Sequence, residues 1–321
     1  MGTIVLRKRL TGFLLPLLLV TTGYGQRVIS GPSGVGSEQS QKITFRSTVS
    51  EVRLLFLATD EHNHTVHDLR REDFAVVDDE RVIREFRSFT RSDAVSLNIM
   101  VLIDSSESVV PRFRQEISDV AKLISQSPWN SRDHVSVLAF GGIEPEFICD
   151  GNCRESFSLD RILPRGGATP LLDAIEMATT LLVQRRRPEF WPVILLFSDG
   201  DDTISKASLG QVREKILNSG EQIYAVDVSN SKQAYNGSAI LRSLAEDSGG
   251  RYVRLSEGTH KIFSDVIDDL HSAHLVTYQL PNSGAKFHSI RILPTHNLQL
   301  QFRCRRGYYQ NTSGPHQEDN P

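Results

Sequence analysis

The chain of 321 residues alternates short apolar runs with amphipathic stretches, most regularly between residues 95 and 274. Residues 96–103 are predicted to form a strand that is buried on both faces, because its apolar positions alternate with neighbours that are also mostly apolar. A short polar loop follows, and amphipathic helical spacing begins at Phe113 and Ile117. A strand, a polar loop and a helix in this order are typical of a βα unit.

The same order repeats along this middle region. Further strands are predicted at residues 134–140, 193–198, 223–228 and 251–255. Further helices are predicted at residues 170–183, 206–218, 238–247 and 259–271. Repeated βα units indicate an α/β fold, a doubly wound and mostly parallel sheet that is flanked by helices. We expect residues 95–274 to form this domain.

Segments rich in β-strand flank the middle domain. Short alternating runs lie before it at residues 42–48, 52–59, 74–78 and 82–89, and after it at residues 275–280, 288–292 and 298–302. Turn-forming residues separate these runs. Because a doubly wound domain is entered and left near one place, we expect segments 42–94 and 275–309 to pack together as a small β module.

The two ends of the sequence differ from the rest. Residues 1–25 are predicted to be a secretory signal peptide, because basic residues precede an apolar core at residues 10–20 and small residues follow it. That core is shorter than a membrane span of about 20 residues, and an uncleaved N-terminal anchor is the alternative. Residues 26–41 are interpreted as a linker and residues 310–321 as a disordered tail. We therefore expect a secreted, periplasmic or cell-envelope protein with no transmembrane span in the mature chain.

The charge of the chain narrows the range of partners. Its formal net charge is −3, and removal of the basic residues of the signal peptide brings it close to −6. Phosphate backbones repel such a chain, so we expect no nucleic-acid partner. Residues 31–38 have the outline of a phosphate-binding loop, but Ser37 and Glu38 occupy the positions of its lysine and its magnesium-binding hydroxyl. We therefore reject an ATP site there.

The cysteines and histidines do not predict a zinc site. Cys149 and Cys153 flank a turn-like sequence, which fits a local disulfide in an oxidising compartment, with two free thiols as the alternative. Cys304 lies in a strand-like segment and is expected to be a buried or half-buried thiol. The histidines between residues 62 and 67 have a spacing that fits no standard zinc ligand set, and we expect a solvated loop there.

Oxygen-bearing side chains accompany three of the predicted elements. Asp104, Ser106 and Ser108 follow the first strand of the middle domain, Thr169 precedes its second helix, and Asp199 follows its third strand. Because open α/β folds bind ligands at the carboxyl edge of the sheet, we expect these groups to converge. All five are hard oxygen donors, which suit Mg²⁺ best and also Mn²⁺ or Ca²⁺. The alternative is a metal-free site in which Ser108 or Thr169 caps a helix.

This pattern resembles the von Willebrand factor A domain, both in the five donors and in the order of strands and helices. The residues that match the family's metal-ion-dependent adhesion site are Asp104, Ser106, Ser108, Thr169 and Asp199. The resemblance implies that the hydroxyls contact the ion directly, that the aspartates do so directly or through water, and that a partner's carboxylate fills the open position. Glu107 and Pro170 depart from the commonest pattern without removing a ligand.

A narrower resemblance covers roughly residues 45–309. The segments Leu69–Phe74, Phe86–Phe89 and Arg305–Tyr309 are similar to bacterial secreted proteins, common in Acidobacteria, that are described as von Willebrand factor A-related. This resemblance implies secretion and β flanks, but it brings no established activity.

Three functions are compatible with the sequence. The leading interpretation is a secreted, non-enzymatic adhesion or protein-interaction module that captures an Asp or Glu carboxylate of a protein partner through Mg²⁺. The second is a metal-dependent hydrolase that uses the same ion, with Asp201, Asp202 or Glu107 as its general base. The third is a structural envelope protein with an empty site.

Overall fold

Six strands of the middle region form one mixed, mostly parallel sheet in the computed structural model, in the order β10-β9-β8-β5-β6-β7. They are β5 (Ser96–Asp104), β6 (His134–Phe140), β7 (Glu146–Cys149), β8 (Phe190–Ser198), β9 (Gln222–Asp227) and β10 (Tyr252–Arg254). All neighbouring pairs are parallel except β6 with β7, which is antiparallel. The predicted α/β fold with a mostly parallel sheet is confirmed.

The structure describes residues 51–91, 96–126, 131–151, 153, 162–229, 235–255, 259–281 and 286–310. The predicted signal peptide, the linker and the strand at residues 42–48 lie outside the described residues, as does the tail beyond Gln310. The described residues belong to one compact unit, Thr48–Pro321. In this part of the chain, no helix combines the length and the apolarity that crossing a membrane requires.

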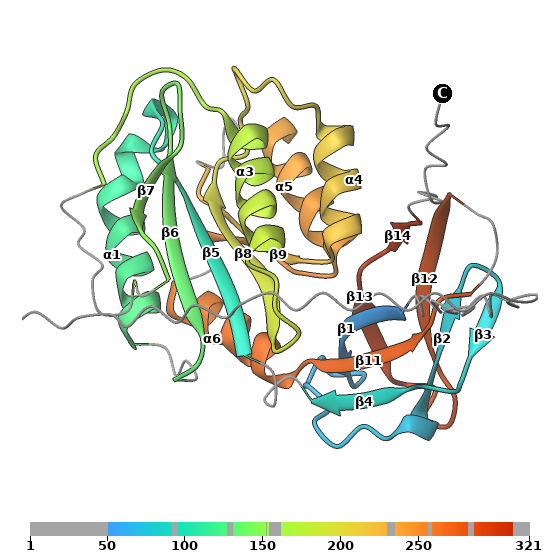
Figure 1. The fold of residues 1–321 in the computed structure, drawn as a ribbon. Coiled ribbons are helices and arrows are strands. Elements are labelled where there is room, and N and C mark those ends of the chain that lie inside the picture. Colours follow the sequence, from blue (N-terminus) through green and yellow to red (C-terminus); the bar gives the residue numbers. More distant parts are fainter. Residues whose placement is uncertain are drawn as a thin grey trace, which may run out of the picture. The chain divides into compact units, whose positions relative to one another are not determined.

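Helices cover both faces of the six-stranded sheet, as Figure 1 shows. They are α1 (Val110–Gln126), α3 (Leu171–Gln184), α4 (Leu209–Ser219), α5 (Tyr235–Ser248) and α6 (Thr259–Ser272). Helices α1 and α6 bury residues such as Val120 and Leu270 against one face, whereas α3, α4 and α5 bury residues such as Ile175 against the other. Each such side chain contributes about 1.5–3 kcal/mol to stability through burial. Because both faces of the sheet are covered, its strands are apolar at nearly every position.

The flanking segments form two antiparallel sheets of four strands each, in the orders β13-β1-β11-β4 and β14-β12-β2-β3. Their strands are β1 (Glu51–Thr59), β2 (Phe74–Asp78), β3 (Arg81–Ile83), β4 (Ser88–Arg91), β11 (His274–Gln279), β12 (Phe287–Pro294), β13 (Gln301–Cys304) and β14 (Gly307–Tyr309). Strand β1 pairs with β11 and β13, and β2 pairs with β12. Segments from before and after the middle domain therefore share both sheets.

Strand β1 contributes to two separate cores. Its residues Leu54 and Phe56 join the cluster between the two antiparallel sheets, which also contains Val76 and Tyr278. Its alternate residues, such as Leu55, belong instead to the cluster beneath α1 and α6. Because neighbouring side chains of a strand point to opposite faces, one strand links the β module to the helical domain.

Short strands were the least predictable elements. The run predicted at residues 82–89 is two strands, β3 and β4, in which Val82 is 56% exposed, whereas Phe86 between the strands is buried. The strand predicted at residues 298–302 lies slightly later, as β13. Strands β7 and β14 have only four and three residues and were not predicted, since so few positions carry no readable period.

The cysteines agree with the prediction. Cys149 and Cys153 form a disulfide with a Cα–Cα distance of 5.4 Å. Cys304 is a free, half-buried thiol on β13. Burial of this thiol raises its pKa to about 12, because an apolar environment disfavours the charged thiolate.

Differential alkylation tests this assignment of the cysteines. At pH 8 the native, unreduced protein is expected to resist iodoacetamide, because the Cys304 thiol stays protonated. Unfolding without reductant exposes Cys304 alone, and unfolding with reductant exposes all three cysteines. Peptide mass spectrometry measures the labels. Alkylation of Cys149 or Cys153 without reductant contradicts the disulfide.

Candidate metal site

The predicted loops lie at the carboxyl edge of the six-stranded sheet. Strand β5 ends at Asp104 and its neighbour β8 ends at Ser198, with Ile103 paired to Phe197. The loop after β5 and the loop that contains Asp199 therefore start side by side. This placement follows from the buried apolar strands, which fix where the chain first becomes polar.

Asp104 is the most deeply buried of the predicted site residues, with 0% of its surface exposed. One of its oxygens accepts a hydrogen bond from the Ser106 amide at 2.9 Å, and the other accepts one from the Ser198 hydroxyl at 2.7 Å. Burial raises the pKa of Asp104 to about 6; the hydrogen bonds from Ser106 and Ser198 oppose this rise and the charge of Asp199 adds to it. Asp104 and Asp199 are thus close enough to repel each other.

The two predicted serines lie together. Their hydroxyl oxygens are 3.1 Å apart, with Ser106 buried and Ser108 exposed in the middle of a short 3-10 helix, Glu107–Val109. Glu107 between them is also exposed. The alternating spacing therefore brings two hydroxyl groups together, next to the buried Asp104 carboxylate.

The loop of Thr169 is held against the other loops by its backbone. The Gly142 amide after β6 donates to the Ala168 carbonyl at 2.8 Å, and the Arg165 amide donates to the Ser105 carbonyl at 2.7 Å. On its other side, the Thr169 amide donates to the Thr203 hydroxyl at 2.8 Å, and the Thr203 amide donates back to the Thr169 carbonyl at 2.9 Å. Thr169 itself is 3% exposed.

The Asp199 loop requires a glycine at its second position. Gly200 has φ +82°, and a Cβ there would lie 2.2 Å from the carbonyl oxygen of Gly237. The Asp201 amide donates to Asp199 at 3.1 Å, which orients that carboxylate. The tight approach of α5 thus fixes the loop that presents Asp199, whose surface is 9% exposed.

The remaining acidic residues of this loop differ in role. Asp202 accepts hydrogen bonds from the Leu172 amide at 3.3 Å and from the Ser205 hydroxyl, so it supports the first turn of α3. Asp201 is exposed, and its pKa is raised first by partial burial and then by the charge of Asp199. Of the predicted candidates for a general base, Asp201 and Glu107 are therefore accessible.

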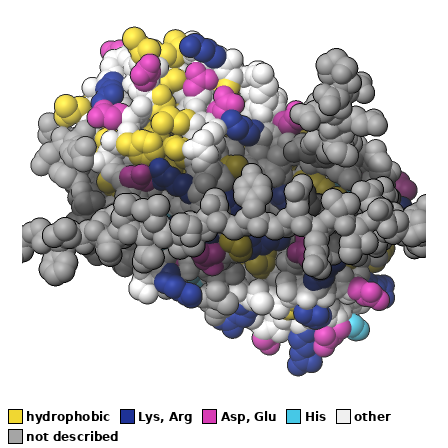
Figure 2. Space-filling model, viewed as in Figure 1, with side chains coloured by type: hydrophobic (Ala, Val, Ile, Leu, Met, Phe, Trp, Pro, Cys, Tyr) yellow, Lys and Arg dark blue, Asp and Glu magenta, His cyan; other side chains and the backbone are white. Residues whose placement is uncertain are grey.

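Exposed apolar side chains accompany the same loops. Ile143, which follows the Gly142 contact, is 84% exposed, Leu163 is 65% exposed, and Ile204 beside Thr203 is 42% exposed. Figure 2 shows hydrophobic side chains gathered over the six-stranded domain, with acidic and basic side chains around them. Two loops that carry oxygen donors thus also present apolar surface, and the loop between β6 and β7 adds Ile143 to it.

A second group with metal-ligand chemistry lies in the β module, where sequence reasoning did not predict one. Asp78, Asp79 and His288 place one ligand atom each within 4.8 Å of one another. These groups are the types that bind divalent metals. Asp78 and His288 are 210 residues apart and meet only because β2 pairs with β12. Spacing along the sequence gives no signal for such a pair.

Hydrogen bonds already occupy the Asp78 carboxylate. It accepts from the hydroxyls of Tyr278 and Tyr308, each at 2.8 Å, and its other oxygen lies 2.8 Å from His288 Nδ1. His288 Nε2 lies 3.1 Å from Gln310. Asp78 and His288 are both 0% exposed. The group therefore forms a satisfied buried polar network, and an ion there would have to replace some of these bonds.

The histidines predicted to form a solvated loop are exposed. The His62, His64 and His67 side chains all lie at the surface, and Asp60 accepts hydrogen bonds from the amides of His62 and His64, each at 2.8 Å.

Comparisons with known proteins agree with this fold. Residues 99–201 match the model of a family described as the von Willebrand factor type A domain. Two curated relatives are magnesium-chelatase 60 kDa subunits. The chain is 27% identical to the subunit of Cereibacter sphaeroides, and the match covers 58% of this chain and 34% of that subunit. It is 25% identical to the subunit of Rhodobacter capsulatus, and the match covers 78% of this chain and 48% of that subunit. The chain thus spans about a third to a half of these relatives.

One similar solved structure is proximal thread matrix protein 1 from the mussel byssus, with a zinc-occupied MIDAS motif. It is 17% identical, the match covers 60% of this chain and 50% of the mussel chain, and the TM-score is 0.46.

Replacing Asp78 tests whether the buried network stabilises the β module. Asp78→Ala leaves two tyrosine hydroxyls and an imidazole without their acceptor, so the free energy of unfolding is expected to fall by about 3 kcal/mol. Urea denaturation measures this change. Glu80→Ala, in the exposed turn next to it, is the control and should change the value by less than about 0.5 kcal/mol. A loss of under about 1 kcal/mol for Asp78→Ala contradicts the stabilising role.

Proposed function

We propose that the Asp104 loop of this chain, whose residues 99–201 match the von Willebrand factor type A domain, holds a divalent cation that captures a carboxylate of a protein partner. The observation that carries the proposal is the buried Asp104 carboxylate, next to Asp199 and two serine hydroxyls. A buried negative charge of this kind requires compensation. A divalent cation supplies it.

The donors fit Mg²⁺. The residues that would hold it are Asp104, Ser106, Ser108, Thr169 and Asp199. Two carboxylates roughly neutralise the ion, and three uncharged hydroxyls complete most of an oxygen shell. Mn²⁺ and Ca²⁺ accept the same donors, whereas zinc favours thiolates and imidazoles, which this set lacks. When bound, the ion supplies an electrophilic position for an incoming carboxylate.

The exposed apolar residues suggest what surrounds that carboxylate on the partner. Leu163 and Ile204 belong to loops that carry donors, and Ile143 belongs to the loop between β6 and β7, whose Gly142 amide bonds to Ala168 beside Thr169. Apolar surface at the rim of a binding site gains free energy when a partner covers it. We therefore infer a protein partner that presents an Asp or Glu side chain among apolar neighbours.

The disulfide supports the location of this protein in an oxidising compartment. Cys149 and Cys153 are bonded, and such bonds persist mainly in secreted, periplasmic and surface proteins. This agrees with the predicted signal peptide and with secretion or a place in the cell envelope, which we include in the proposal.

A metal-dependent hydrolase is the second candidate, favoured by the exposed Asp201 next to Asp199, with its raised pKa. A general base needs access to a metal-bound reactant, which Asp201 has. Generic phosphoester and ester substrates, with and without EDTA, separate the two functions. Turnover that EDTA abolishes favours the hydrolase, and metal binding without turnover favours the interaction module.

Removal of Asp104 tests the metal site. In wild type, Mg²⁺ at a hundred times its Kd is expected to raise the melting temperature by about 5 °C or more. Asp104→Ala is expected to abolish this Mg²⁺-dependent rise, and Asp68→Ala, an exposed aspartate of the β module, should retain it. Differential scanning fluorimetry measures both. A wild-type melting temperature that Mg²⁺ leaves unchanged contradicts the proposal.

Substitution of Ile143 tests the partner surface separately from the metal. Ile143→Glu places a carboxylate at the rim of the site, where it repels an acidic partner. The amount of partner protein that the variant captures from the surface fraction of the host is therefore expected to fall at least about tenfold. Its Mg²⁺-dependent melting shift should stay as in wild type. Val183→Glu, at another exposed apolar residue, on α3, is the control. Capture that persists in EDTA counts against a metal-bridged contact.

A further inference from the structure

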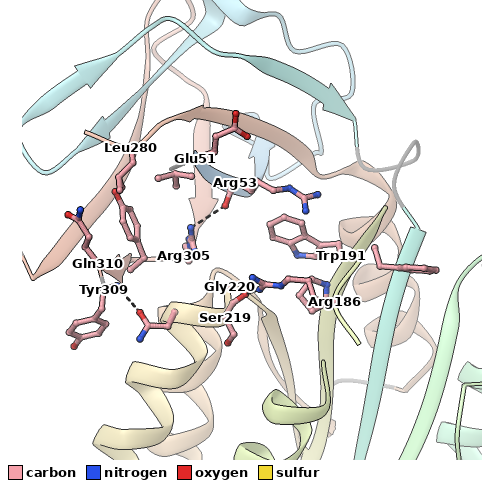
Figure 3. Close-up of a pocket in the computed structure, with 15 residues that line it drawn as sticks. Glu51, Arg53, Arg186, Trp191, Ser219, Gly220, Leu280, Arg305, Tyr309 and Gln310 are labelled. Carbon is pink, nitrogen blue, oxygen red and sulfur yellow. Dashed lines mark hydrogen bonds between the residues drawn. The ribbon is translucent and has the colours of Figure 1, made fainter. Parts of the chain in front are cut away.

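A pocket of about 320 Å³ lies between the β module and the helical domain. Figure 3 shows the side chains around it. Three arginines line it: Arg53 on β1, Arg186 just after α3, and Arg305 between β13 and β14. They come from three distant parts of the sequence, so the pocket exists only in the folded chain.

The three arginines bond to carbonyl groups rather than to carboxylates. Arg53 donates to the Pro188 carbonyl at 3.0 Å, and Arg186 donates to that of Ser219 at the end of α4. Arg305 donates to the carbonyls of Leu217 at 3.2 Å and Arg53 at 3.1 Å. Other arginines of the chain form ion pairs, as Arg303 does with Asp269. Among the described residues, these three form none.

These arginines also act on one another. Burial lowers the pKa of Arg53 and of Arg305, and the charge of Arg186 lowers both further, while the charge of Glu51 partly opposes this for Arg53. The carboxylate that lines the pocket, Glu51, is ion-paired with Arg87. Glu221 lies near Arg186, but it is buried and burial raises its pKa. Among the described lining residues, three guanidinium groups thus share one carboxylate, which is itself paired with Arg87.

Two buried donors at this pocket lack partners among the described residues. Trp191 is 5% exposed and its indole Nε1 is unpaired, as is Nε of Arg305. Arg53 lies over the Trp191 ring, with its guanidinium carbon 5.7 Å from the ring centre. The hydrogen bonds to carbonyls at the end of α4 use only some of the guanidinium N–H groups, because each guanidinium has five. The indole N–H is not explained by that role.

We propose that this pocket binds a small organic anion through a carboxylate or phosphate group. Guanidinium groups match the planar or tetrahedral oxygens of such groups with paired hydrogen bonds. The indole N–H adds a donor, and the Trp191 ring adds an apolar surface. The volume is at the lower end of the range for small-molecule sites.

This site is separate from the Asp104 loop. Trp191 lies near the start of β8, whereas Ser198, which donates to Asp104, ends the same strand. Seven residue steps along a strand span about 23 Å. Ligand binding in the pocket is therefore expected to be independent of Mg²⁺.

Tryptophan fluorescence tests the proposal. Trp129 is the other tryptophan of the chain, so Trp129→Phe leaves Trp191 as the only one. Citrate and inorganic phosphate are titrated in EDTA at constant ionic strength. A saturable change in fluorescence is expected with at least one of them, and the responding anion identifies a carboxylate or a phosphate site. Linear or absent responses to both overturn the proposal.

Arginine variants in the same Trp129→Phe background locate the binding. Arg186→Gln and Arg53→Gln are each expected to weaken binding by about ten- to a hundredfold, as loss of a charge-assisted hydrogen bond does. Arg185→Gln is the matched control, because its side chain pairs with Asp150 at 2.9 Å. Circular dichroism checks that each variant is folded. Equal loss in Arg185→Gln, or unchanged binding in both folded pocket variants, overturns the proposal.

Discussion

The candidate metal site depends on one buried charge, the Asp104 carboxylate at the end of β5. Helices cover both faces of this strand, so the carboxylate at its end is also buried. Bonds from the Ser106 amide and the Ser198 hydroxyl orient it, but neither donor carries a charge. Asp199 adds a second negative charge nearby. Buried like charges are costly unless a cation compensates them, which supports the proposal that these loops hold an ion.

The two ends of β8 carry opposite electrostatic character. At its carboxyl end are Asp104 and Asp199 with their hydroxyl neighbours, and near its start is Trp191 among three arginines. The arginines meet there because β1 and the strands after α6 pack against the helical domain. The β module therefore supplies part of a second site, in addition to the buried Asp78 network that holds its own sheets together.

The parts that were predictable are those with a local signal. The apolar strands and the amphipathic helices carry their periods within one element, and the polar residues at the strand ends follow directly from them. Asp78 with His288, and Arg53 with Arg305, meet over 210 and 252 residues, and no local pattern connects them. Strands such as β14 are too short to show a period. Sequence reasoning thus found the loops of the helical domain but not the polar groups between paired strands.

Anomalous diffraction from a crystal soaked in Mn²⁺ tests the central claim most directly, because it locates the ion without reference to activity or partner. We expect one strong peak bounded by the Ser106 and Ser108 hydroxyls and the carboxylates of Asp104 and Asp199. The absence of a peak there, or a peak only at Asp78, Asp79 and His288, would contradict the claim that the Asp104 loop is the metal site.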